Sequence, residues 1–267
     1  MTNPTRTAGS RLYTSNVTKA GALLSEARVL LDWWQPELSV DANFERVRTD
    51  NLLGARSHAQ AALIAQTLRR RYFDDPELGA ALLTFARHPA AANNWLNFLL
   101  YFFALQDDLT LRSLMLNVVY PYRGQGLEAT LEQAFYYETC AWSDCGLTAR
   151  RWSRATARQT SRSAAQALRE FGALSRGRMS NPPLPAFAFI AFWLRRRNAS
   201  GMNVLSSYDW KLFLLEEDDV ERRLLDAHQW KLLEYFAAGS TIRIGFPAES
   251  LEAYAKWLTT APAAAAI

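Results

Sequence analysis

Arginines are the residues of this sequence whose type and spacing most clearly indicate a binding site. Residues 150–178 contain eight arginines and a single acid, Glu170, so this segment carries a net charge of +7. A guanidinium group can bind a phosphate or a guanine edge through two parallel hydrogen bonds. If the segment forms one helix, four of its arginines align along one flank. These are Arg151, Arg158, Arg162 and Arg169. Such a flank predicts contact with a polyanion.

Two amide side chains make nucleic acid the favoured polyanion. Gln159 and Gln166 lie beside the arginine flank, and amides next to arginines are suited to reading base edges. Aromatic side chains, which stack on the bases of single strands, are limited here to Trp152 and Phe171. We therefore expect double-stranded DNA as the partner, with RNA as the alternative nucleic acid. The candidate DNA contacts in this segment are Arg150, Arg151, Arg154, Arg158, Gln159, Arg162, Gln166, Arg169, Arg176 and Arg178.

A second candidate site lies nearer the N-terminus. Helices predicted over 39–50 and 57–72 are joined by an Asn-Leu-Leu-Gly turn, which makes them a helix-turn-helix candidate. The candidate DNA contacts here are Arg56, Ser57, Arg69 and Arg70. Positive charge at a helix C-terminus also stabilises the helix dipole, so the run 69–71 is equally well interpreted as a helix end. The run 195–197 closes an apolar helix and is interpreted as a helix end too.

The arginine-rich segment has two alternative interpretations that do not involve nucleic acid. The region from Asp209 to Glu234 contains eight acids against four bases, so it could neutralise residues 150–178 within the fold. Genomic GC bias would also favour arginine, which makes up 26 of the 30 basic residues. A stripe of like charge costs stability through self-repulsion, so a polyanionic partner is the simpler interpretation.

No motif predicts catalysis or a bound metal. The three histidines are far apart in sequence and form no ligand pattern, and Cys140 and Cys145 fit no common zinc spacing. Residues 124–126 read Gly-Gln-Gly but lack the strand and the third glycine of a dinucleotide site. The acidic run 216–219 fits the solvated first turn of a helix. We expect a protein that is not an enzyme and that needs no metal or cofactor.

The elements that must position these arginines are mainly helical. Apolar residues recur at helical spacing through most of the chain, and a single short strand is expected over 241–246, where Ile and Phe alternate. Helical stretches are expected at 18–34, 39–50, 57–72, between 76 and 120, and at 127–142 and 150–172. The last of them ends in Phe-Gly-x-Leu before a basic loop, which is typical of a recognition helix that passes into a wing. We predict a mainly α fold of two helical lobes, with helix-turn-helix or winged-helix-like elements and short β wings.

Composition and punctuation set the predicted domains. With 49% hydrophobic and 21% charged residues, the chain has the composition of a folded globular protein. The loop at 123–126 is a plausible boundary between the lobes. The predicted divisions are a flexible N-terminus at 1–17, a lobe with the helix-turn-helix candidate at 18–122, a lobe with the winged-helix-like element at 123–260, and a disordered tail at 261–267.

The most apolar runs predict buried helices and no membrane insertion. Residues 95–105 and 184–194 are the two longest, and each covers about half of the ~20 residues that a membrane-spanning helix needs. The first ten residues lack the apolar stretch of an export signal. We expect a cytoplasmic protein.

Three segments resemble a known family. They are the stretch from Thr18 to Arg28, the Asn51-Leu-Leu-Gly-Ala-Arg-Ser57 turn and the helix end at Arg69–Arg71. Together they resemble the BrxA family, the small helical component of BREX phage-defence systems. The resemblance implies a mostly helical, two-lobed protein that has been compared with the antitermination factor NusB, contains helix-turn-helix elements and binds DNA. It also implies other BREX proteins as partners.

The residues and the resemblance lead to one functional prediction. We expect a non-catalytic accessory protein of a BREX-type system that binds double-stranded DNA. One alternative is an RNA-binding factor of the NusB type. The other is a structural adaptor whose basic stripe docks on an acidic partner protein.

Overall fold

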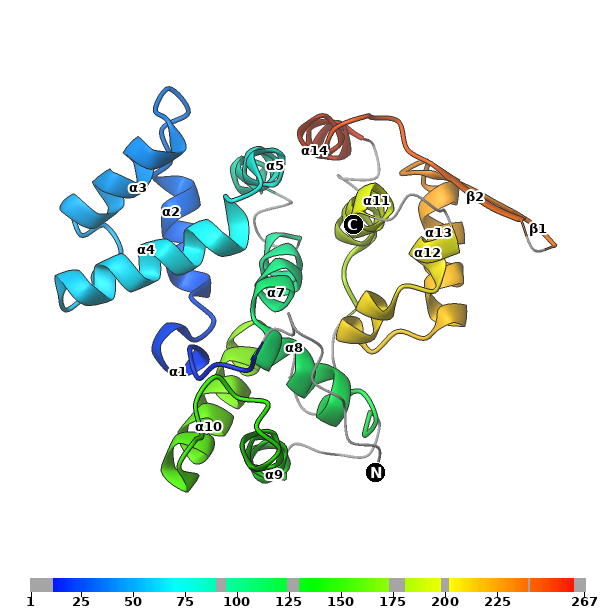
Figure 1. Ribbon diagram of the computed structural model, residues 1–267. Coiled ribbons are helices and arrows are strands. Elements are labelled where there is room, and N and C mark those ends of the chain that lie inside the picture. Colours follow the sequence, from blue (N-terminus) through cyan, green and yellow to red (C-terminus); the bar gives the residue numbers. More distant parts are fainter. Residues whose placement is uncertain are drawn as a thin grey trace.

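The computed structural model is mainly helical, as the sequence predicts, and describes residues 12–89, 95–123, 130–172, 181–197, 202–239 and 241–261. Figure 1 shows its helices and a projecting hairpin arranged around α7. The elements are α1 (Val17–Ala20), α2 (Leu24–Asp32), α3 (Val40–Thr49), α4 (His58–Tyr72), α5 (Pro76–Arg87), α7 (Leu96–Asp107), α8 (Leu109–Leu114), η1 (Met115–Val119), α9 (Leu131–Asp144), α10 (Arg154–Glu170), α11 (Leu184–Arg197), α12 (Met202–Leu205), η3 (Tyr208–Phe213), α13 (Glu217–Gln229), β1 (Glu234–Ala238), β2 (Thr241–Gly245) and α14 (Leu251–Thr260).

Side-chain caps begin several helices where the sequence predicts them. The side chains of Ser39, Ser57 and Asp75 accept backbone N–H groups in the first turns of α3, α4 and α5, at 3.0 to 3.3 Å. Pro76 then occupies the first position of α5, where a missing N–H costs nothing. The candidate helix-turn-helix therefore has the helix bounds that its sequence indicates.

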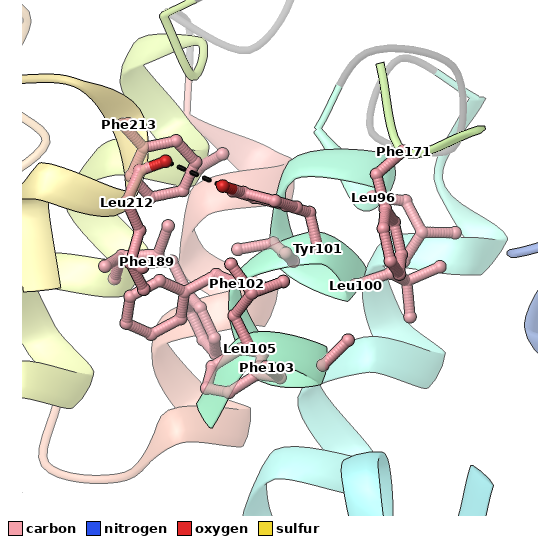
Figure 2. Packing of buried hydrophobic residues seen from close by; sticks show 14 of the residues in the cluster. Leu96, Leu100, Tyr101, Phe102, Phe103, Leu105, Phe171, Phe189, Leu212 and Phe213 are labelled. Atoms are coloured by element: carbon pink, nitrogen blue, oxygen red, sulfur yellow. Dashed lines mark hydrogen bonds between the residues drawn. The ribbon is translucent and has the colours of Figure 1, made fainter. Parts of the chain in front are cut away.

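The core is built around α7, whose residues from Leu99 to Leu105 are all buried. Figure 2 shows its aromatic residues packed against η3 and against Phe171 at the end of α10. Tyr101 donates a hydrogen bond to the Leu212 carbonyl at 2.7 Å, and burial raises the pKa of its phenol well above the ordinary value. The runs predicted to be buried helices are thus the buried helices α7 and α11. In the part of the chain that the structure describes, no helix has the length and apolarity to cross a membrane.

The stretch 18–34, predicted as one helix, is two. The chain turns at Gly21 and Leu23, whose φ angles of 58° and 53° lie in the left-handed region and end α1 before α2 begins. The break frees the carbonyls of Gly21 and Ala22, and the Arg71 guanidinium donates to both, at 3.2 and 3.0 Å. A tertiary contact that local spacing does not reveal therefore accompanies the end of the helix.

The helical region between 76 and 120 is also interrupted. α7 ends at Asp107, and the side chain of Asp108 caps α8 by accepting the Leu111 N–H at 3.1 Å. The last turn before Tyr120 is π-helical. A helix that was continuous through Asp108 would leave that buried carboxylate without its backbone donor, so the cap and the break occur together.

The β structure is a hairpin that follows α13. β1 pairs antiparallel with β2, with Tyr235 opposite Ile244. The strand predicted over 241–246 is confirmed, whereas β1 was missed because Glu234–Ala238 has only one buried side chain and no clear alternation. The basic loop at 176–178, predicted to begin a wing, lies outside the described residues, as does the 124–126 loop.

The hydrophobic core runs through both of the predicted lobes. One buried cluster contains Val17 near one end of the described chain and Ala261 at the other. α7 packs against α4 and α5 as well as against α11, and α14 packs along α5 (Figure 1). An ion pair of 2.9 Å between Arg196 and Glu77 joins α11 to α5. The core is continuous across residue 123, and the domain division predicted there remains a prediction.

Candidate nucleic-acid interface

The predicted arginine flank lies on α10, which packs against α9. The side of α10 that faces the protein consists of small or apolar residues. Its buried residues are Ala157, Thr160, Ser161, Ala164, Ala165, Ala167 and Leu168, and Phe171 is buried just beyond the helix. Such small side chains let two helices approach closely. The opposite side of α10 is therefore the side that carries charge into solvent.

Hydroxyl groups fix α10 against α9 from inside the contact. The Thr139 and Ser161 hydroxyl oxygens lie 3.1 Å apart, and both residues are buried. Ser161 also donates to the Ala157 carbonyl at 2.8 Å. Buried hydroxyls with partners stabilise one relative position of the helices, so the exposed face of α10 is rigidly presented.

The start of α10 corrects the predicted flank. Ser153 has an extended conformation, and its hydroxyl accepts the Thr156 N–H at 3.1 Å, so the helix begins at Arg154. Just before it, the Trp152 N–H donates to the Ser143 hydroxyl at 2.8 Å, which holds that residue outside the helix. Arg151 therefore does not belong to the helical flank as predicted, and Arg150 also lies in the segment that leads into α10.

The arginines on α10 form an exposed stripe. All four of its members are exposed, and the first three follow one another at one helical turn. We call these residues the α10 stripe: Arg154, Arg158, Arg162 and Arg169. The stripe thus lies on the predicted side of the helix, with Arg154 in place of Arg151.

Carboxylates of α9 pair with the two ends of the α10 stripe. Arg154 lies 3.3 Å from Asp144, and Arg169 lies 3.2 Å from Glu132. The pKa of Arg154 is raised by a hydrogen bond with Cys140 and then by the charge of Asp144. Both ion pairs are open to solvent, so the carboxylates screen these arginines without holding them away from a ligand.

The centre of the α10 stripe has no such neutralisation. The Arg158 guanidinium lies over the ring of Tyr136, 5.4 Å from its centroid. Neither Arg158 nor Arg162 forms an ion pair with any carboxylate in the described ranges. A cation–π contact leaves the guanidinium charged and its N–H groups available. Two adjacent turns of α10 therefore present uncompensated positive charge.

The two predicted amides lie beside this centre. Gln159 donates to Ser163 at 3.3 Å, and Gln166 donates to Glu170 at 2.8 Å, and both amides are exposed. Each is held by a contact within the helix that a ligand could replace. The structure thus brings the predicted amides and three of the four predicted flank arginines together on one surface.

Sequence reasoning missed the α9 side of this surface. α9 contains three acids and no basic residue, and α10 contains four arginines and one acid, so the two helices together carry no net charge. The signal was present, because consecutive helices usually lie next to each other in space. Tyr136, which lies under Arg158, was also missed, as was Tyr137, whose ring lies 6.0 Å from that of Tyr136 and which is 62% exposed.

Several acids of the region from Asp209 to Glu234 contact other parts of the fold. Asp209 pairs with Arg112 at 2.6 Å, and Glu216 pairs with Arg123. Within the described parts of the chain, no ion pair joins an acid of this region to the α10 stripe. The alternative that this region neutralises the stripe is therefore wrong, and the carboxylates that do approach it come from α9.

The second predicted set lies on the α3–α4 pair, away from α10 (Figure 1). Ser57 caps α4, and Arg56 is exposed just before it. Arg69 pairs with Asp41 of α3 at 2.6 Å, and Arg70 donates two hydrogen bonds to Asp107 of α7. The arginines at the end of α4 are thus matched by acids, and DNA contact by this set remains a prediction. Arg176 and Arg178 lie outside the described residues.

The described residues hold no group of three or more His, Cys, Asp or Glu side chains that could bind a metal ion. Comparison with known proteins places the chain more specifically. A family model described as BrxA matches residues 11–192, which include both predicted DNA-contacting sets. No curated protein matches the chain.

Proposed function

We propose, from the premise that the chain belongs to the BrxA family and so is a component of a BREX phage-defence system, that its function is to bind DNA. In this proposal it is a non-catalytic protein that binds double-stranded DNA through the α10 stripe. The non-catalytic part rests on the sequence, whose histidines and glycines form no catalytic or nucleotide-binding motif.

One observation carries the DNA-binding proposal. Arg158 and Arg162 are exposed on adjacent turns and lack carboxylate partners in the described part of the fold, while other arginines nearby are paired. Two unpaired guanidinium groups repel one another, and a phosphate backbone relieves that repulsion. The stripe spans 16 residues from Arg154 to Arg169, and their Cα atoms are about 22 Å apart along the helix. A helix of that length can meet phosphates on both sides of a major groove, which is about 12 Å wide.

The amides supply the second element of recognition. Gln159 and Gln166 are exposed beside the unpaired arginines and could exchange their weak intrahelical contacts for hydrogen bonds to base edges. Phosphate contacts position a protein on the duplex, whereas base contacts select the sequence. We therefore expect the arginines to set affinity and the two amides to set sequence preference.

Salt dependence and mutation test the proposal together. The affinity of the purified protein for a labelled duplex is measured by mobility shift at increasing salt, with wild type, Arg158→Ala/Arg162→Ala and the control Arg222→Ala. Arg222 is 72% exposed on α13 and pairs only within its own helix. We expect the slope of log affinity against log salt to fall by about 0.9 for each lost phosphate contact. A double variant with wild-type affinity and slope would contradict the proposal.

A specific observation also favours testing the adaptor alternative. Tyr137 is largely exposed, and Arg158 lies over Tyr136, and Tyr with Arg is the combination enriched in protein–protein interfaces. A protein that binds no duplex, yet loses a BREX partner when Arg158 and Arg162 are changed, would favour the adaptor. Competition of structured RNA against duplex DNA for the same probe separates the RNA alternative.

A further inference from the structure

A second basic surface lies at the opposite side of the molecule from α10, in a cavity of about 640 Å³. Its walls are the end of α11, the turn after α13 and one face of the β1–β2 hairpin. Volumes of 300 to 1,000 Å³ are usual for sites that bind small molecules. Of the residues that line it, only Phe192 falls within the segment matched by the BrxA family model. The cavity is therefore a feature of the part of the chain that follows the match.

The charges that line this cavity are mostly positive and unpaired. The lining contains three cationic side chains, those of Arg195, Lys231 and Arg243, and one acidic side chain, that of Glu234. None of the three cations forms an ion pair or hydrogen bond from its side chain within the described ranges. Outside those ranges the sequence contains a single acid, Glu128. The lining thus has a surplus of two positive charges, which is close to the charge of a phosphate dianion.

Arg195 differs from the two arginines that follow it. Arg196 donates to the Glu249 carbonyl and pairs with Glu77, and Arg197 donates to Gln106 at 3.1 Å. Arg195 has only the ring of Phe246 beneath it, 5.9 Å from the centroid. Two members of this arginine run therefore hold the fold together, while the third points its charge at the cavity.

Lys231 occupies a backbone position that favours glycine. Its φ is 57°, and its N–H and that of Leu232 close the end of α13 by donating to the carbonyls of His228 and Ala227. This is the Schellman arrangement, in which the left-handed residue is most often Gly. A lysine there costs stability, and strained positions of this kind cluster at binding sites. Binding of a ligand by the Lys231 ammonium group would explain why a lysine occupies this strained position.

The remaining lining completes a site for an anion. His228 Nδ1 accepts the Tyr235 N–H at 3.3 Å, so the ring proton lies on Nε2, which is a donor. Glu234, Arg243 and Gly245 lie on one face of the hairpin by their register. A side chain at position 245 would approach the Glu234 carboxylate to 2.9 Å, so the glycine leaves room at this face.

We propose that this cavity binds a phosphate group, through the side chains of Arg195, Lys231 and Arg243 with the His228 ring as a further donor. The phosphate can belong to a free nucleotide or to a nucleic-acid backbone, since both present the same oxygens to the site. The proposal does not depend on DNA binding by α10, because the two surfaces share no residue.

Calorimetric titration with pyrophosphate, ATP and a short DNA duplex tests the site on the full-length protein. We expect wild type to bind at least one of these probes, and Arg195→Gln/Arg243→Gln to weaken that binding at least tenfold. Arg222→Gln, on the exposed side of α13, is the matched control and should bind as wild type does. Binding of pyrophosphate or ATP identifies a free phosphate ligand. Binding of the duplex alone identifies a backbone phosphate in this cavity only if Arg195→Gln/Arg243→Gln weakens it, since α10 is proposed to bind duplex DNA independently.

Lys231→Gly separates binding from folding. Glycine relieves the left-handed backbone, so the melting temperature should rise while phosphate affinity falls severalfold. A variant that merely unfolds would show the opposite change in melting temperature. Absence of binding by every probe, or equal affinities of wild type and Arg195→Gln/Arg243→Gln, would overturn the proposal. If duplex binding is lost in Arg158→Ala/Arg162→Ala and kept in Arg195→Gln/Arg243→Gln, DNA binding belongs to α10 alone.

Discussion

The end of α4 and the exposed face of α10 are both rich in arginine, but they differ in how far carboxylates of the fold neutralise that charge. At the end of α4, three consecutive arginines meet carboxylates from two other parts of the chain, which are α3 and the junction of α7 and α8. On α10, carboxylates of the described residues reach only the ends of the stripe, and none of them pairs with the centre. The difference shows that arginine content alone does not identify a nucleic-acid surface. What matters is whether tertiary neighbours have already supplied the anions.

Arg71 is the extreme case of this internal use. Its side chain is 1% exposed and donates to the carbonyls of Gly21 and Ala22. The carboxylates of Asp107 and Asp108 lie 3.8 and 3.9 Å away. Burial raises the pKa of Asp108, while the charge of Arg71 opposes that shift. The guanidinium thus ties the break before α2 to the junction of α7 and α8.

The largest effect that we predict follows from this burial. Arg71→Met should lower the free energy of unfolding by about 3 to 5 kcal/mol, because the buried carboxylate of Asp108 loses its cation and the carbonyls of Gly21 and Ala22 lose their donor, whereas Asp107 keeps Arg70. Urea unfolding followed by circular dichroism measures the change. Arg48→Met is the matched control, since Arg48 is half-exposed and pairs with Glu45 only within α3. If both variants unfolded at the same urea concentration as wild type, the two classes of arginine would not differ as described.

Leu168→Ala tests the support of the α10 stripe. Leu168 is fully buried on the side of α10 opposite the arginines, and its loss leaves a cavity. We expect a cost of about 2 to 5 kcal/mol in the free energy of unfolding. The affinity per folded molecule should stay near that of wild type, provided that α10 keeps its position. Unfolding and mobility shift are measured on the same preparation, and an unchanged stability would contradict the burial of this side chain.

The double variant Arg158→Ala/Arg162→Ala tests the exposed side. Both arginines are off the buried face, and Ala has the higher helix propensity by a few tenths of a kcal/mol. Stability should therefore change by less than about 0.5 kcal/mol, whereas affinity for duplex DNA should fall by roughly tenfold or more because at least two phosphate contacts are lost. A lower melting temperature with wild-type affinity per folded molecule would show that the stripe is structural.

The contrast between these regions also shows what sequence could predict. Local signals predicted the starts of α3, α4 and α5 correctly, because a helix start depends on residues within one or two turns. The start of α10 at Arg154 was missed, although Ser153 is a residue type that commonly caps helices. The helix was predicted from residue 150 because the arginine pattern includes Arg150 and Arg151. The roles of Asp144 and Glu132 could not come from α10 alone, because they depend on how α9 packs beside it. The burial of Arg71 depends on the break at Gly21, more than 40 residues away.

The smallest effect belongs to the two exposed arginines of α4, and it sharpens the comparison most. Arg69 and Arg70 were predicted as DNA contacts, yet each is paired with an aspartate. The Arg69–Asp41 pair is open to solvent, and Asp107 keeps Arg71 at 3.8 Å when Arg70 is removed. Each of the two lost pairs should therefore cost about 1 kcal/mol or less, so Arg69→Ala/Arg70→Ala should be only slightly destabilised. DNA binding by these residues would require the duplex to compete with Asp41 and Asp107 for each guanidinium. We therefore expect the affinity to fall by about twofold or less, well below the loss from the α10 pair, because only unpaired arginines gain their full counterion release. Mobility shift on both double variants at one salt concentration decides this. An equal loss from the two variants would mean that α4 contacts DNA despite its ion pairs, and that neutralisation within the fold does not separate the two regions.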